Sequence, residues 1–221
     1  MDNAMIEVSG PELPILDGSA KDFFEGFLRI GTTSQNASKK AILIKEPLEV
    51  NLGGRVARVR PASFLSIQAE IEWPHPVIGR QSYRYDSRYD HFSEIADSRT
   101  FGFVKHVEAM RAKGLIQGGS LDSAIVLDDE DVLNPDGLRS PDEFVRHKVL
   151  DAMGDFRLAG CSFRGAFELL KSGHEVHCEL LKLIFSNPSH YEVIELKRDE
   201  DFSKNDLFVN LAARNRLPTA I

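Results

Sequence analysis

The sequence predicts an α+β fold, in which a series of strands is followed by two helices. Apolar and polar residues alternate over much of 41–72, which is typical of half-buried strands. Two later segments open with a Ser-x-x-Glu pattern and continue with helical spacing, which predicts helices over about 141–158 and 172–186. A run at 191–196 predicts a last strand. Strands and helices grouped in this way are typical of α+β folds.

Turn residues divide the strand region. Gly53 and Gly54 are expected to form a turn between two strands. The run Trp73-Pro74-His75-Pro76 is expected to be irregular, because a proline restricts the residue before it. Val104–Lys113 has helical spacing and stops at Gly114, so a helix is predicted there. Extended segments are predicted at Ala41–Lys45, Leu48–Asn51, Arg55–Arg60, Phe64–Glu72, Tyr83–Asp90 and Ala124–Leu127.

The beginning of the chain predicts a smaller unit, with a short strand at Ala4–Val8 and an amphipathic helix at Lys21–Ile30. A polar linker follows at 32–40. One strand and one helix are too few to bury an apolar face, so the unit either docks on the rest of the chain or is the tail of a domain. If the face stays exposed, it favours aggregation or a partner. The helix face carries Phe23, Phe24 and Phe27.

Composition narrows the class of protein. A net charge of −7 gives no general attraction to nucleic acid, so no nucleic-acid partner is expected. The two cysteines, Cys161 and Cys178, form no Cys-x-x-Cys pair and are too few to build a disulfide framework, which favours a reducing cytoplasm. The chain shows no secretory signal pattern at its start and no apolar run of the roughly 18 residues that span a membrane, so no transmembrane segment is expected.

The helix predicted from Pro141 carries two different faces. One face is a core stripe formed by Val145, Val149, Ala152 and Phe156. On the other face, His147 and Asp151 are four residues apart and lie one above the other, which is a workable spacing for two ligands of one metal ion. Lys148 and Asp155 share that face, where Lys148 could meet a phosphate and Asp155 could orient an imidazole. Alternatively, the same residues form an ordinary solvated helix face.

His174 lies in the first turn of the next predicted helix, directly after a glycine. One interpretation is a general acid that also assists an oxyanion. The other interpretation is an exposed histidine near a helix N-terminus, which is the more common case. The residues alone leave both open.

Several segments, in order and over nearly the whole chain, resemble the UDP-3-O-acyl-N-acetylglucosamine deacetylases. They are Ser98–Phe103, Gly118–Val126, Val132–Arg139, Asp142–Lys148 with its continuation Leu150–Asp155, and Lys171–His174, together with Ile6–Val8 and Pro14–Ala20. This resemblance implies a zinc-dependent enzyme that removes the N-acetyl group of UDP-3-O-acyl-N-acetylglucosamine, the committed step of lipid A synthesis in Gram-negative bacteria. It also implies two similar α+β domains, each a sheet layered on helices, with the site between them.

The resemblance also implies roles for single residues. The zinc ligands would be His147 and Asp151. His174 would be the general acid, oriented by Asp155, and Thr100 would stabilise the oxyanion. The substrate contacts would be Phe101, Lys148 and Ser120. An insert at about 99–125 would form a passage for the acyl chain, although its apolar residues Val107, Met110 and Leu115 could equally be core.

One part of the family pattern has no counterpart here. The family's third zinc ligand lies in a Glu-His-Leu segment whose glutamate is the general base, and no Glu-His pair occurs in this chain. Because Met1 directly precedes Asp2-Asn3, the first domain is expected to be largely missing. The expected division is a remnant of an N-terminal α+β domain at 1–36 and a C-terminal α+β domain at 37–221.

Little deacetylase activity is therefore expected from this chain alone, because two ligands hold zinc weakly and no base is positioned. One explanation is that the start codon is misplaced or the gene is split, so that the true protein is the deacetylase, and a separate polypeptide could supply the missing half in trans. Alternatively, the chain is a non-catalytic relative that binds the UDP-acyl-sugar or a partner, or a relic without function.

Overall fold

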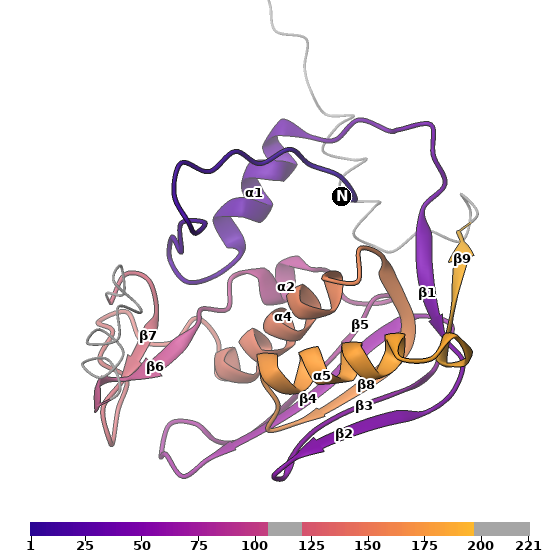
Figure 1. Ribbon diagram of the computed structural model, residues 1–221. Coiled ribbons are helices and arrows are strands. Elements are labelled where there is room, and N and C mark those ends of the chain that lie inside the picture. The colour runs from indigo at the N-terminus through magenta and orange to yellow at the C-terminus, as the bar shows by residue number, and fades with distance from the viewer. Residues whose placement is uncertain (106–120, 197–221) are drawn as a thin grey trace, which may run out of the picture.

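The computed structural model describes residues 1–105 and 121–196, and a seven-stranded mixed sheet with helices on one face forms its centre (Figure 1). The strands follow the order β2-β3-β8-β1-β9, and β4 and β5 extend the sheet on the other side of β8. This arrangement confirms the predicted α+β class. The strands are β1 Lys40–Ile44, β2 Leu48–Leu52, β3 Arg55–Pro61, β4 Leu65–Trp73, β5 Gly79–Asp86, β8 Ser162–Leu170 and β9 Tyr191–Glu195.

Within this seven-stranded sheet, the central strand β8 is the one that the sequence pattern does not predict. Its first residues pair in parallel with β1, and its second half lies between β3 and β4. Gly165 interrupts the strand pattern, because glycine weakens a strand and offers no side chain to pack. The fold requires this glycine: a Cβ atom there would lie 2.9 Å from Cγ1 of Ile44 and 3.2 Å from Cγ2 of Val59.

The strands of this sheet that the sequence does predict form within one residue of their expected bounds, except β5. Gly53 and Gly54 both have positive φ angles and connect β2 to β3, as predicted. Strand β5 differs from its prediction at both ends: it begins at Gly79, four residues before the predicted start at Tyr83, and it ends at Asp86, four residues before the predicted end at Asp90. Its first residues pair with the end of β4, where Gly79 lies opposite Trp73. They carry no apolar alternation, so backbone hydrogen bonding extends the strand beyond its hydrophobic signal.

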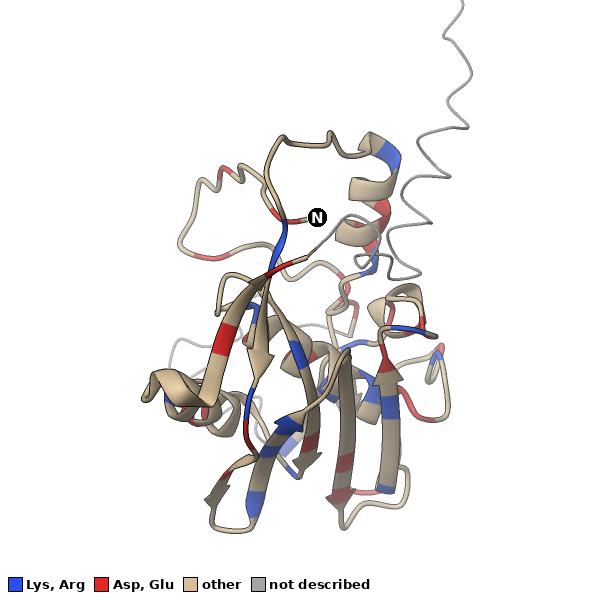
Figure 2. Cartoon of the chain, turned by 90° about the vertical axis from the view of Figure 1, so that its right-hand side faces the viewer, with Lys and Arg blue, Asp and Glu red and all other residues tan. Residues whose placement is uncertain are grey.

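The two faces of the sheet differ in chemistry. Side chains such as Ile67, Val59 and Phe167 point to the helices and are buried. The opposite face carries charged side chains, among them the ion pairs of Arg58 with Glu49 and of Arg80 with Glu70. Figure 2 shows positive and negative residues along the strands that face the viewer. Such a division is common in sheets that pack on a core on one side and meet water on the other.

Helices α4 (Glu143–Arg157) and α5 (His174–Phe185) cover the apolar face. The predicted core stripe of the first helix is confirmed, because Val145, Val149 and Ala152 are fully buried and Phe156 is 3% exposed. Phe156 also stacks on Phe167 of β8, with ring centroids 4.2 Å apart. The helix therefore has one face fixed in the core, and its polar face points away from the sheet.

Neither predicted capping box forms. The residue before α4 is Asp142, whose side chain makes no capping bond, and the Glu143 carboxylate bonds Arg99 instead. At α5, Gly173 is the N-cap, and the Ser172 hydroxyl lies 2.8 Å from Nε2 of His177. In both places the Ser-x-x-Glu pattern correctly predicts where a helix starts, but the side chains bond other residues instead of capping the helix.

The N-terminal unit forms only in part. Helix α1 (Lys21–Ile30) has its predicted bounds, but Ala4–Val8 is exposed and forms no strand. An isolated strand needs a neighbour for its backbone groups, and none of the described strands pairs with it. Phe24 packs edge-on against Phe92, which precedes the short helix α2 (Ser93–Ala96). The other two phenylalanines, Phe23 and Phe27, are each 37% exposed.

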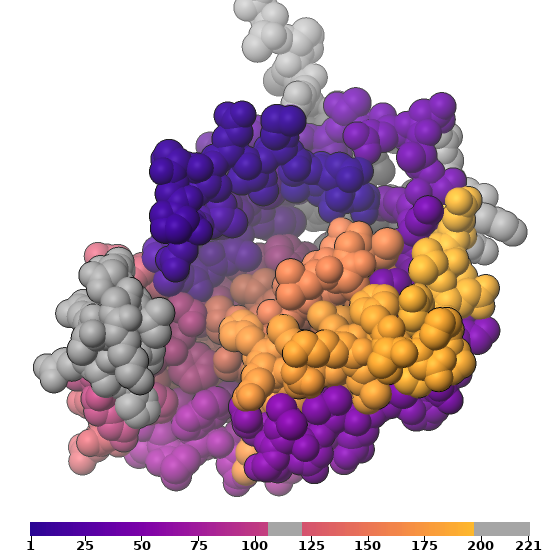
Figure 3. All heavy atoms as spheres, in the orientation of Figure 1, coloured from indigo at the N-terminus to yellow at the C-terminus, as the bar shows by residue number. Residues whose placement is uncertain are grey.

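A tight turn docks this unit on the rest of the chain, which agrees with the first of the two sequence-based readings. The Thr100 amide donates to the Gly18 carbonyl at 2.8 Å, and the Asp17 carboxylate pairs with Arg139 at 2.8 Å. Gly18 has a φ of 82°, and a Cβ atom there would overlap the carbonyl oxygen of Ser123. In the space-filling view, the indigo N-terminal residues stand above the orange helices with a hollow between them (Figure 3).

A second, two-stranded parallel sheet consists of β6 (Phe101–Phe103) and β7 (Ile125–Leu127). The segment that connects them contains most of the predicted helix Val104–Lys113, the apolar residues Val107, Met110 and Leu115, and Ser120. These residues from 106 onwards lie outside the described part of the chain. A short 3₁₀ helix, η1 (Pro188–His190), leads from α5 into β9.

Replacing Gly165 by alanine should destabilise the protein. The added methyl group must displace Ile44 or Val59 in the centre of the sheet, and overpacking of this kind typically costs about 1–3 kcal/mol. Urea denaturation followed by circular dichroism measures the free energy of unfolding. Gly154→Ala is the matched control: nothing lies within 4 Å of a Cβ there, and alanine is favoured over glycine inside a helix by about 0.5–1 kcal/mol. Equal stability of Gly165→Ala and the wild type would contradict the packing described.

Candidate functional site

The polar face of α4 brings His147, Lys148 and Asp151 into direct contact. Nε2 of His147 lies 3.1 Å from Oδ1 of Asp151, and Nζ of Lys148 lies 2.9 Å from Oδ2 of the same carboxylate. The i,i+4 spacing on the helix accounts for the first contact and the i,i+3 spacing for the second. The His147 and Asp151 side chains are only 10% and 15% exposed. This cluster is therefore more enclosed than an ordinary solvated helix face.

A backbone carbonyl fixes the orientation of the His147 ring. Nδ1 of His147 lies 3.0 Å from the carbonyl oxygen of Ser98. A carbonyl only accepts, so Nδ1 donates, and in the neutral ring Nε2 then carries the lone pair. That lone pair faces the Asp151 carboxylate, which is also an acceptor. The two atoms attract each other only if the ring is protonated or a cation lies between them.

The donor set at this position fits a zinc ion. Imidazole nitrogen and carboxylate oxygen are both zinc ligands. Histidines that bind metals usually donate their other ring N–H to a carbonyl or carboxylate, as His147 does to Ser98. Burial alone would raise the pKa of the Asp151 carboxyl, but the hydrogen bond and charge of a protonated His147 ring, together with the charge and hydrogen bond of Lys148, outweigh it and hold that pKa well below its ordinary value. The carboxylate is therefore ionised and available as a ligand.

A buried ion pair holds the Ser98 segment against the start of α4. Oε1 of Glu143 accepts from both the backbone N and Nε of Arg99, at 3.0 and 2.9 Å. Its Oε2 accepts from the backbone N of Arg139 at 2.6 Å, and Nη2 of Arg99 also reaches the Gly137 carbonyl at 2.7 Å. Burial raises the pKa of the fully enclosed Glu143 carboxyl, yet these hydrogen bonds lower it further than burial raises it. The pair thus fixes the loop that presents Ser98 to His147.

The same loop continues into Thr100 and Phe101. The Phe101 ring packs edge-on against Trp73 and Phe144, and Nζ of Lys148 lies 5.5 Å from its centroid. Thr100 is half-buried, and its backbone bonds Gly18 on one side and Ile125 on the other. The structure therefore brings Phe101 and Lys148 to the His147 cluster. Ser120 lies outside the described residues.

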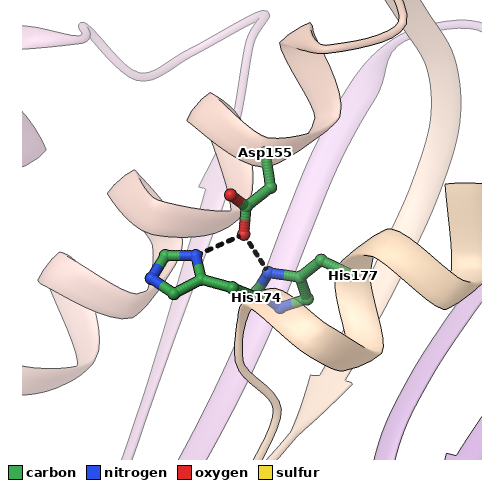
Figure 4. A group of neighbouring side chains, drawn as sticks. All are labelled: Asp155, His174 and His177. Carbon is green, nitrogen blue, oxygen red and sulfur yellow. Dashed lines mark hydrogen bonds and ion pairs between the residues drawn. The ribbon is translucent and has the colours of Figure 1, made fainter. Parts of the chain in front are cut away.

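One turn further along α4, Asp155 meets the start of α5. Its Oδ2 lies 2.8 Å from Nδ1 of His174 and 2.7 Å from Nδ1 of His177 (Figure 4). The His174 side chain is 67% exposed, whereas His177 is fully buried. Burial raises the pKa of the Asp155 carboxyl, but the hydrogen bonds from His177 and His174 outweigh it, and the net pKa is lowered. Asp151 and Asp155 are four residues apart, about 6 Å along the helix axis. The two clusters therefore lie in one row along α4, which consists of His147, Lys148, Asp151, Asp155, His174 and His177.

His177 is the member of this row that the sequence reading omits. Its signal is the His-x-x-His spacing of His174 and His177 at the start of a helix, which puts both rings on one side. Glu143 and Arg99 are also omitted, because the Ser-x-x-Glu pattern assigns Glu143 to a capping box. Their pairing spans 44 residues of sequence, and no local pattern indicates it.

Two sets of residues in this row are candidates for a metal. Among the described residues, Asp155, His174 and His177 form a group of three whose ligand atoms lie within 4.8 Å of one another. In that group, however, each Nδ1 already has the carboxylate as its partner. At His147 and Asp151 two acceptors face each other instead. On this ground the His147–Asp151 position is the better cation site, although no third ligand residue joins it in the described chain.

A depression of about 200 Å³ beside β2, β3 and β8 is lined by residues such as Leu48, Arg58 and Glu168. None of the row residues borders it. The hydrogen-bonded row, rather than this depression, therefore defines the candidate site.

The fold and the row together define an α+β protein with a group of His and Asp side chains whose ligand atoms lie close enough together for one metal ion. The model of the LpxC family, described as UDP-3-O-acyl N-acetylglycosamine deacetylase, matches residues 1–186, and the chain belongs to this family. This result confirms the resemblance seen in the sequence motifs.

Curated relatives agree with this assignment. A UDP-3-O-acyl-N-acetylglucosamine deacetylase of Nitratidesulfovibrio vulgaris is 46% identical over 89% of this chain and 64% of its own length. One of Neisseria meningitidis is 42% identical over 97% of the chain and 70% of its own length, and one of Bdellovibrio bacteriovorus is 44% identical over 90% and 66%. The chain thus spans about two thirds of the length of the relatives it matches. Within its described part, no helix is long and apolar enough to cross a membrane.

Glu143→Gln should destabilise the protein and change how its stability depends on pH. The substitution leaves Arg99 buried without its charge partner, and breaking a buried pair typically costs about 3–5 kcal/mol. The pKa of Glu143 is lowered from 4.5, so its contribution is complete above that pH and is lost as the pH falls below it. Urea denaturation between pH 7 and pH 3 measures the difference between variant and wild type, which should shrink on acidification.

The control for this prediction is Glu49→Gln. Glu49 also pairs with an arginine, Arg58, but both side chains are nearly half exposed. Exposed pairs contribute little to stability, because water screens their attraction. A loss from Glu143→Gln no larger than that of the control would contradict the anchoring role.

Proposed function

We propose that this chain belongs to the catalytic machinery for hydrolytic N-deacetylation of UDP-3-O-acyl-N-acetylglucosamine, a step of lipid A biosynthesis. Membership of the LpxC family and the printed names of the relatives support the reaction class. The observation that carries the proposal is the pairing of His147 Nε2 with Asp151, with Nδ1 fixed on the Ser98 carbonyl. The compartment that we propose is the cytoplasm, in keeping with the two free cysteines.

In this proposal His147 and Asp151 hold zinc, which would act as a Lewis acid towards the acetamide carbonyl of the substrate. Thr100 would donate to the oxyanion that develops on that carbonyl. Phe101 offers an apolar ring to the substrate, and the Lys148 ammonium lies beside that ring and can meet an anionic group. Ser120 remains a further proposed substrate contact.

His174 is the proposed general acid. Its Nδ1 is hydrogen-bonded to Asp155, and two thirds of its side chain is exposed. A proton carried on Nε2 is therefore accessible to a leaving amine, while Asp155 keeps the ring from rotating. General acid–base catalysis of this kind typically contributes about 10²–10⁴ in rate.

We further propose that the chain alone turns over slowly. Hydrolytic zinc sites usually have three protein ligands, and the described residues supply two at His147 and Asp151. No Glu-His pair is present in the sequence to provide the third ligand and the base. A second polypeptide that carries such a pair could complete the site in trans. The same shortage favours the alternative that the chain binds the UDP-acyl-sugar without turnover.

Asp151→Asn should weaken zinc binding at least about tenfold, because the anionic ligand is replaced by a neutral amide of the same size; losses of about 10–100-fold are usual even for residues that only support metal ligands. Competition with a chromophoric chelator measures the affinity. Asp129→Asn is the control, since Asp129 is 81% exposed and pairs with Lys105 away from the row. Unchanged zinc affinity in Asp151→Asn would exclude this metal position.

Calorimetry with the UDP-acyl-sugar and acetate release from the same zinc-loaded sample test the reaction itself. We expect binding, weakened by Lys148→Ala but not by Lys182→Ala, whose ammonium is exposed on α5. We expect slow acetate release above the buffer rate, falling by about 10²-fold or more in His174→Gln because the general acid is lost. Tight ligand binding without zinc uptake and without acetate release would instead support the non-catalytic alternative.

A further inference from the structure

A single carboxylate oxygen connects two imidazoles at the start of α5. Oδ2 of Asp155 is the partner of Nδ1 in both His174 and His177. The two rings differ completely in exposure, since His174 faces solvent and His177 is fully buried. The buried ring packs on Phe156 with centroids 5.4 Å apart, so it is held by the core as well as by polar contacts. Figure 4 shows both rings directed at the same oxygen from one side of the helix.

The hydrogen-bond acceptors in these contacts determine which ring nitrogens carry hydrogen. An ionised carboxylate accepts only, so both Nδ1 atoms carry hydrogen. In the neutral rings the lone pair is then on Nε2. For His177 that lone pair faces the Ser172 hydroxyl at 2.8 Å, which donates to it. For His174, Nε2 has no role in these contacts and is the atom left to exchange a proton.

We propose that His177 is a positioning residue, which holds Asp155 in place and thereby fixes His174 in the tautomer with hydrogen on Nδ1. Asp155 lies on α4 and has rotational freedom about its own side-chain bonds. The buried His177 ring, held by Ser172 and Phe156, gives the Asp155 Oδ2 a fixed partner, and the exposed His174 is then oriented by a carboxylate that cannot turn away. The tautomer of a histidine is set by the partner of its other nitrogen. The importance of this arrangement for catalysis rests on the general-acid role proposed for His174.

Replacing His177 by asparagine or by glutamine distinguishes the roles of its two ring nitrogen atoms. The amide NH₂ of asparagine lies where Nδ1 lies in histidine, so His177→Asn retains a donor to Asp155 and loses the contact with Ser172. The longer glutamine places its amide near the position of Nε2, so His177→Gln retains the contact with Ser172 and loses the donor to Asp155. A residue needed only for packing would be affected similarly by both changes.

The test is ¹⁵N–¹H correlation spectroscopy of the imidazole rings, at a pH where they are neutral and without added metal. In the wild type, we expect His174 and His177 both to carry hydrogen on Nδ1. His177→Asn should keep the Nδ1–H signal of His174. His177→Gln should lose it in favour of a mixture of tautomers. Thermal unfolding of the same samples reports the packing cost separately.

The proposal is overturned if wild-type His174 carries hydrogen on Nε2, which needs no variant to fold. It is also overturned if folded His177→Asn loses the Nδ1–H signal, or if folded His177→Gln keeps it. The spectra do not depend on turnover. Failure of the proposed deacetylation with an intact Nδ1–H pattern would therefore count against the function and leave the positioning role standing.

Discussion

The buried carboxylate of Glu143 connects three parts of the chain that meet at the candidate site. It bonds the backbone and side chain of Arg99, the backbone of Arg139 and, by its place in the first turn, the start of α4. Arg139 in turn pairs with Asp17 of the N-terminal turn. Because the Ser98 carbonyl next to Arg99 fixes the His147 ring, the orientation of the first proposed metal ligand depends on this one ion pair.

From that anchor the polar face of α4 divides into two chemically different clusters. At His147 and Asp151 the fixed tautomer puts two acceptors opposite each other, which calls for a positive charge between them. At Asp155, two imidazole N–H groups face one carboxylate oxygen, so donors and acceptor are paired without an added ion. We therefore propose cation binding at one turn of the helix and proton transfer at the next. Membership of the LpxC family supports the reaction class for which these two roles are proposed.

Most of the fold and much of the site follow from local patterns in the sequence. The stripe of Val145, Val149 and Ala152 predicted the buried face of α4, and the i,i+4 spacing of His147 and Asp151 predicted their contact. Strand β8 was not predictable, because Gly165 interrupts its strand pattern. The reason for this glycine is the close approach of Ile44, which belongs to a strand more than a hundred residues away in the sequence. Ala4–Val8 has a strand pattern but no neighbour in the described sheets, and so it does not pair.

The side chains at the helix starts show the same limit. Glu143 and Ser172 have the positions of capping residues, but a buried arginine and a buried histidine compete for them. The bond between Arg99 and Glu143 is charge-assisted and is worth more than a helix cap in a comparable place, and sequence spacing cannot show that such a partner is near. His177 was overlooked for the related reason that its partners lie on α4 and before α5.

The most direct test of this account is anomalous X-ray diffraction at the zinc edge from crystals grown with zinc. The account predicts a peak within coordination distance of Nε2 of His147 and the Asp151 carboxylate, about 2.0–2.2 Å from each, with the Ser98 carbonyl still bonded to Nδ1. A peak among Asp155, His174 and His177 with none at His147, or crystals without any bound zinc, would contradict it.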